Sequence, residues 1–188
     1  MVLLVIDTQD LIMTDKLFEF DTLISNISLL IHEARKTNTE VIFIRHDDGP
    51  GEELTQGVPG FNIFDGFKPE PGEQIFDKTV NSPFKESGLL NYLKEKQETH
   101  IIVTGLQTDK CINATVISGF EHGFHMIVPA YANSTIDNPY MNAGQSYHYL
   151  NEYIWPRRYA ECTSVEQVIQ HYLYNAKPTD TCRKGESR

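Results

Sequence analysis

Three side chains of this sequence have the chemistry of a cysteine nucleophile and its activators: Asp7, Lys78 and Cys111. Asp7 and Lys78 each end a short strand-like run, and Cys111 stands where a helix is expected to begin. Taken singly, each has an ordinary structural role: Asp7 could cap a loop, Lys78 could be a solvated surface residue, and Cys111 could be an inert packed thiol. Together, a lysine and a helix N-terminus lower the pKa of a thiol. We therefore predict that Cys111 is a reactive nucleophile with a lowered pKa, alkylated faster than Cys162, and that Asp7 carries its proton.

Alternating strands and helices are predicted to position these residues. Val2–Ile6 is a continuous apolar run, typical of a strand buried on both faces of a parallel sheet. Apolar residues at spacings of three and four then predict a helix with Asp21 as its N-cap. Further strands are predicted at Val41–Ile44, Gln74–Phe76, Ile101–Val103 and His125–Val128, with helices near Ser87–Lys96, Cys111–Glu121, Tyr140–Tyr149 and Ser164–Tyr174.

This alternation predicts an α/β protein, a three-layer αβα Rossmann-like fold with a mainly parallel central sheet. Ligands of such folds bind at the carboxyl ends of the strands, where the three residues are expected to meet. A length of 188 residues suits one domain, which we place at residues 1–176, followed by a polar tail at 177–188. Residues 46–83, rich in Gly and Pro, are predicted to form a long functional loop.

Charge and composition disfavour several classes of function. The chain carries 16 Lys and Arg against 26 Asp and Glu, a net charge of −10, so we expect no nucleic-acid partner. The longest apolar run is short of a membrane span and no basic segment precedes it, so we expect a cytoplasmic protein with no membrane partner. Three cysteines without CxxC spacing predict no disulfide framework, and we assign no role to Cys162 or Cys182.

Three segments carry the candidate residues: VIDTQ at Val5–Gln9, DKTVNSPF at Asp77–Phe84 and VTGLQTDKCINATV at Val103–Val116. Together they resemble the isochorismatase-like cysteine hydrolases, in order and spacing over roughly residues 1–175. The resemblance implies a catalytic triad of Asp7, Lys78 and Cys111, with Gln9 as a supporting residue at the end of the first strand.

The same resemblance implies further features of the site. It places a cis peptide bond at Leu106–Gln107 and an oxyanion hole in the backbone N–H groups of Gln107 and Cys111. It also implies a homo-oligomer, a dimer or a tetramer, that acts on a small molecule.

No metal and no other cofactor is expected. Metal-binding amidases that resemble this family, such as the nicotinamidases, have a DxH pattern after the second strand and a later histidine, whereas this chain reads HDDGPG from His46 to Gly51. We interpret His46 as a loop histidine that is hydrogen-bonded beside its acidic neighbours. The phosphate-binding glycine patterns are also missing, which disfavours a nucleotide cofactor.

The expected reaction is hydrolysis of a small carboxamide or related C–N bond through a thioester on Cys111. Two alternatives stay open: a non-catalytic binding or assembly module on the same fold, and isochorismate-type hydrolysis of a vinyl ether, which the presence of Cys111 disfavours. Aromatic side chains at such positions also serve as core or subunit contacts. The residues predicted to line the substrate pocket are Gln9, Phe61, Phe84 and Tyr131, with Phe64 and Trp155 as further candidates for its wall.

Overall fold

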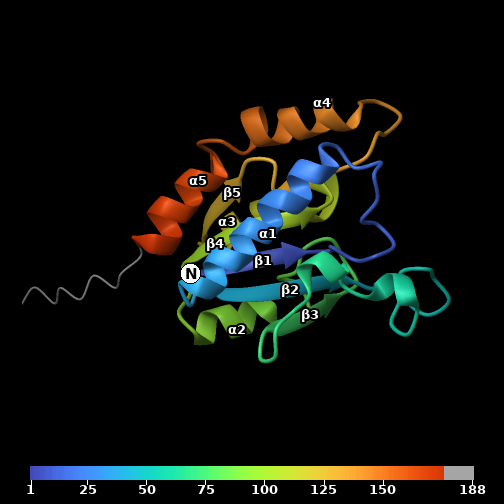
Figure 1. Ribbon diagram of the computed structural model, residues 1–188, viewed down its shortest axis with the longest axis horizontal. Helices are drawn as coiled ribbons and strands as arrows, with labels where there is room; N and C mark the ends of the chain where they lie inside the picture. The colour runs from blue at the N-terminus through green and yellow to red at the C-terminus, as the bar shows by residue number, and fades with distance from the viewer. Residues whose placement is uncertain (176–188) are drawn as a thin grey trace, which may run out of the picture.

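A sheet of seven parallel strands forms the centre of the protein. Figure 1 shows this sheet between layers of helices. The computed structural model describes residues 1–175; the predicted tail at 177–188, with Cys182, lies outside the described residues. The strand order is β3-β2-β1-β4-β5-β7, and β6 pairs with the carboxyl end of β4 beyond β5. The strands are β1 (Val2–Ile6), β2 (Glu40–His46), β3 (Gln74–Lys78), β4 (His100–Leu106), β5 (His125–Pro129), β6 (Asn133–Ser134) and β7 (Ala160–Thr163).

Helices connect these strands and cover both faces of the sheet. The α-helices are α1 (Phe20–Lys36), α2 (Leu89–Glu95), α3 (Asn113–Glu121), α4 (Ala143–His148) and α5 (Val165–Val168). Single π-helical turns precede α3 at Thr108–Ile112 and extend α4 and α5 at Tyr149–Ile154 and Ile169–Tyr174. Within residues 1–175, the structure contains no helix long and apolar enough to cross a membrane.

Side-chain alternation along the strands produces the three layers. In β1, Leu3 and Val5 pack with the apolar stripe of α1 and with α5, whereas Leu4 and Ile6 pack on the opposite face with α2 and α3. All five residues of β1 are buried because helices cover both sides of it. The predicted α/β architecture with a mainly parallel sheet is thereby confirmed.

Three details of the sequence interpretation are wrong. Asp21 is not an N-cap, since α1 begins at Phe20 and the Asp21 carboxylate lies in its first turn. The short strands β6 and β7 were not predicted, and β7 contains Cys162. Residues 46–83 are also more ordered than a loop, because besides the predicted strand β3 they contain two turns of 3₁₀ helix, at Pro59–Phe61 and Asp65–Phe67.

Candidate active site

Four side chains converge where neighbouring strands end at one edge of the sheet. Asp7 follows β1, His46 ends β2 and Lys78 ends β3, in a register that pairs His46 directly with Lys78. Cys111 lies in the π-helical turn that leads from β4 into α3. The structure therefore brings the three predicted catalytic residues together at the carboxyl edge of the sheet, and it adds His46 to them.

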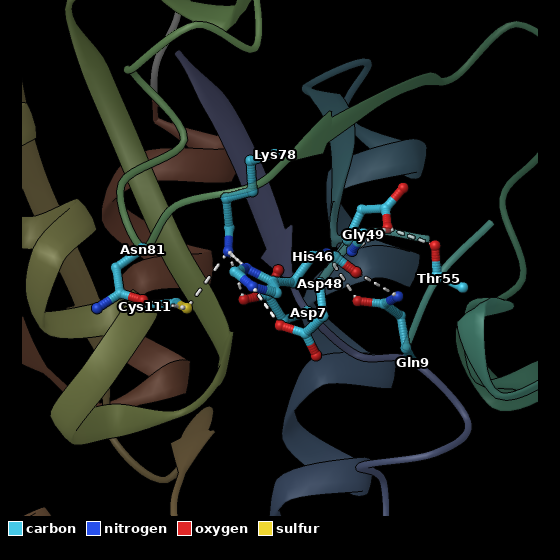
Figure 2. A network of polar contacts seen from close by, with 10 residues as sticks. Asp7, Gln9, His46, Asp48, Gly49, Thr55, Lys78, Asn81 and Cys111 are labelled. Atoms are coloured by element: carbon cyan, nitrogen blue, oxygen red, sulfur yellow. Dashed lines mark hydrogen bonds and ion pairs between the residues drawn. The ribbon is translucent and has the colours of Figure 1, made fainter. Parts of the chain in front are cut away.

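Lys78 is the centre of this cluster. Its Nζ lies 2.8 Å from Asp7 Oδ2, 2.9 Å from His46 Nδ1 and 3.3 Å from Cys111 Sγ (Figure 2). An ammonium group has three N–H donors and no acceptor, so these three partners use all of them. Lys78 is only 2 % exposed, so its ammonium depends on these three side chains for its hydrogen bonds.

The backbones of β4 and β1 approach each other so closely beside Asp7 that position 105 requires glycine. Gly105 has φ +112°, and a Cβ there would lie 2.0 Å from the carbonyl oxygen of Ile6. Asp7 itself has φ 52°, a left-handed conformation that aspartate tolerates better than most residues. The Leu106–Gln107 peptide bond is cis.

Hydrogen bonds hold the turn that carries Cys111. The carbonyl oxygen of Gln107 accepts from the backbone N–H groups of Lys110 and Ile112, at 3.0 and 3.1 Å. The carbonyl oxygen of Cys111 accepts from the hydroxyl of Thr115 at 2.6 Å. The thiol itself donates to Asn81 Oδ1 across 3.7 Å. The position of Cys111 at the start of a helical segment agrees with the sequence analysis.

The electrostatics of the cluster differ from the prediction. Burial raises the pKa of the Cys111 thiol to about 12, and the Asp7 carboxylate adds to the rise while Lys78 opposes it. Burial likewise raises the pKa of Asp7, again against the effect of Lys78. The predicted lowered thiol pKa is therefore wrong, because desolvation outweighs the nearby ammonium. The pKa of the Cys162 thiol is also raised by burial to about 12.

A cavity of about 280 Å³ opens onto the thiol. Its walls combine the reactive groups with polar and apolar side chains. The lining residues are Asp7, Ile12, His46, Asp48, Leu54, Asn81, Gln107, Lys110 and Cys111.

The residues predicted to line the pocket do not line this cavity. Gln9 is fully buried and hydrogen-bonds the backbone of His46 and Phe61. Phe61 is buried under the guanidinium of Arg45, Phe84 stacks on Phe124, and Tyr131 stacks on Tyr147. The three aromatic side chains pack against neighbouring groups, which is the commoner role of aromatic residues.

The two further aromatic candidates also lie in packed positions. Phe64 contacts Phe67 edge to face, and Trp155 is fully buried with its indole N–H donated to Asn113 at 2.9 Å.

The ligand atoms of Asp7, His46 and Cys111 lie within 4.8 Å of one another, a set of atom types that zinc accepts. All three residues already hydrogen-bond the Lys78 ammonium, which supplies the positive charge at that point. A metal ion among them would have to displace a buried ammonium from its partners. We therefore derive no step through a metal.

Sequence reasoning missed the roles of His46, Asp48 and Asn81. His46 does hydrogen-bond an acidic neighbour, as predicted, with Nε2 3.0 Å from Asp48 Oδ1, but its contact with Lys78 was not foreseen. A polar residue that ends a strand next to β1 was the signal that could have placed His46 in the site.

Comparisons with known proteins agree with this architecture. A family model described as the isochorismatase domain matches residues 1–157. A solved structure of an isochorismatase-family protein from Chromobacterium violaceum superposes with a TM-score of 0.84, at 22% identity, over 90% of this chain and 91% of that one. A likeness at this identity shows the shared fold.

Three curated relatives match shorter stretches. The secreted isochorismatase effector Isc1 of Verticillium dahliae is 29% identical over 64% of this chain and 64% of its own length. A streptothricin hydrolase of Streptomyces noursei is 28% identical over 58% of this chain and 40% of its own. The ureidoacrylate amidohydrolase RutB of Methylobacterium radiotolerans is 28% identical over 50% of this chain and 37% of its own length. The chain thus spans less than two thirds of the length of each.

Proposed function

This chain belongs to the isochorismatase family, and from that premise we propose that it hydrolyses a small carboxamide or related C–N bond through a thioester on Cys111. One observation carries the proposal: a buried lysine ammonium hydrogen-bonds both a carboxylate and a thiol beside an open cavity. The arrangement supplies a nucleophile, a proton carrier and a fixed positive charge, which acyl transfer needs.

The first step forms the thioester. Cys111 Sγ attacks the substrate carbonyl carbon, and the thiol proton passes to Asp7. Asp7 Oδ1 has no hydrogen-bond partner within residues 1–175, which leaves it free to accept that proton. The backbone N–H groups of Gln107 and Cys111 stabilise the oxyanion, and Asp7 returns the proton to the departing nitrogen as the C–N bond breaks.

The second step releases the acid. Asp7 takes a proton from a water molecule as the water oxygen attacks the thioester carbonyl. The C–S bond breaks, and the proton returns to the Cys111 sulfur. Lys78 stays an ammonium throughout and balances the single negative charge that moves between Asp7, the sulfur and the oxyanion.

The size and lining of the cavity support a small polar substrate. A volume of about 280 Å³ is just below the usual range for small-molecule sites. Amide, carbamoyl and ureido compounds are the classes to test first, since two of the curated relatives are named a streptothricin hydrolase and a ureidoacrylate amidohydrolase.

The alternatives receive less support. A binding or assembly module would not need Asp7, Lys78 and Cys111 to keep contact in a buried cluster. Hydrolysis of a vinyl ether would not need Cys111.

The test is a substrate panel read by the ammonia released. Primary amides, carbamoyl compounds and ureido acids are incubated with the wild-type protein, Cys111→Ala and Cys162→Ala. We expect release by the wild type and by Cys162→Ala, because Cys162 lies away from the cavity on β7. Release that is equally fast with Cys111→Ala would refute the proposal.

A further inference from the structure

We propose that His46 is a positioning residue that holds the Lys78 ammonium in register with Asp7 and Cys111, and that Asp48 fixes the required tautomer of His46. The catalytic consequence of this role rests on the proposed function, whereas its effect on the thiol does not.

The hydrogen bonds of Lys78 determine which ring nitrogen of His46 is unprotonated. Its ammonium can only donate, so the 2.9 Å contact with His46 requires Nδ1 to be the unprotonated ring nitrogen and to accept. Asp7 and Cys111 take the other two N–H groups. His46 is thus the third acceptor that a buried ammonium needs.

Asp48 completes the chain of contacts from the other side of the ring. Once Nδ1 accepts, Nε2 must carry the proton, and Asp48 Oδ1 lies 3.0 Å from it as the acceptor. The two ring nitrogens of His46 thus contact Asp48 and Lys78, one each, and Figure 2 shows these three side chains grouped beside Asp7 and Cys111. The carboxylate therefore selects the tautomer that Lys78 requires.

The backbone of His46 is fixed as well. Gln9 Oε1 accepts from the His46 backbone N–H at 2.8 Å, and Gln9 Nε2 donates to the His46 carbonyl oxygen at 3.0 Å. The buried Gln9 side chain, which follows β1, thus binds both the backbone N–H and the backbone carbonyl of His46. This gives Gln9 a function that its position outside the cavity does not suggest.

Two substitutions of His46 test the contacts of its two ring nitrogens separately. Asparagine places an amide group near the position of Nδ1 and can accept from Lys78, whereas glutamine reaches the position of Nε2 and Asp48. His46→Asn should therefore preserve the contact with Lys78, and His46→Gln should lose it. His46→Leu removes both contacts and is the third variant of the series.

The first readout needs no substrate. Iodoacetamide alkylation of Cys111 is followed by peptide mapping in each variant, and thermal unfolding confirms that each is folded. A lysine that leaves the sulfur makes the thiolate harder to form, so His46→Gln and His46→Leu should slow alkylation about tenfold. The alkylation rate of His46→Asn should stay within about threefold of the wild-type rate, because this variant keeps the charge-assisted hydrogen bond to Lys78.

The second readout uses a substrate found in the panel. His46→Gln should lower kcat about tenfold with a smaller change in KM, since the role concerns the reacting groups. Equal alkylation rates for His46→Gln and His46→Asn would overturn the inference, whatever the hydrolysis results. Alkylation rates that follow the expected order, with no hydrolysis of any compound, would instead uphold the inference and count against the proposed function.

Discussion

Asp7 and Cys111 face a single ammonium, so the cluster accommodates one negative charge between them more readily than two. The pKa of each is raised by burial, and the charge of Asp7 raises that of Cys111 further. We therefore infer that the resting state holds a carboxylate and a thiol, and that the thiolate forms only as Asp7 accepts the proton during attack.

Asp7→Asn should separate thiol reactivity from catalysis. Without the carboxylate charge, Lys78 is left to lower the pKa of Cys111, so the thiolate fraction rises and iodoacetamide alkylation at pH 8 should be about tenfold faster than in the wild type. Hydrolysis should be lost because no base remains. Alkylation of the wild-type thiol should keep rising with pH above 9, since its pKa is about 12. A wild-type plateau near pH 8, or slower alkylation in Asp7→Asn, would contradict this account.

Chelation should leave the activity intact. Lys78 occupies the point between Asp7, His46 and Cys111 and supplies the positive charge of the site. Overnight dialysis against a chelator, followed by the ammonia assay, should retain most of the rate. Loss of activity that zinc or manganese restores would return a metal-dependent mechanism to first place.

At the scale of elements, the contact between β1 and β4 positions the site. Gly105→Ala would place a methyl group 2.0 Å from the Ile6 carbonyl, one residue before Asp7. We expect a loss of about 3 kcal/mol or more in the free energy of unfolding, measured by denaturant titration, because backbone cannot move aside cheaply. Gly72→Ala is the control: its φ is similar, +98°, but no atom lies within 4 Å, so about 1 kcal/mol is expected. Equal losses would show that close approach is not the cause.

The core strands were predictable because a continuous apolar run is a signal contained in the local sequence. β1 is buried along its whole length, and any strand buried on both faces must read this way. β7 gives no such signal, since Ala160–Thr163 is short and only partly buried, with no continuous apolar run. The two residues of β6 are shorter than any pattern can detect.

Strand ends predicted the catalytic cluster but not its surroundings. The positions of Asp7 and Lys78 follow from where the predicted strands end, a rule that depends on neighbouring residues alone. The role of Gln9 depends on His46, 37 residues away, and burial of the Cys111 thiol depends on the whole fold. Pairings and desolvation of this kind arise from tertiary structure, which is why the pocket residues and the thiol pKa were mispredicted.

At the scale of the whole molecule, the protein is expected to form a dimer or a larger closed oligomer. Large aromatic side chains are exposed next to α4, with Tyr140 at 91% and Tyr153 at 74% of their surface accessible. Exposed apolar groups of this size are common at subunit contacts. Light scattering at micromolar concentration should give a multiple of 21.5 kDa. A species of 21.5 kDa under those conditions would contradict the expectation.

The central claim is that the chain works through a covalent acyl group on Cys111. The measurement that tests it most directly is rapid acid quenching during turnover of a substrate from the panel, followed by intact mass and peptide mapping. We expect the mass to rise by that of the acyl group, on the peptide that contains Cys111, and no such adduct with Cys111→Ala. Steady release of ammonia with no adduct on Cys111, and with Cys111→Ala equally active, would contradict the account.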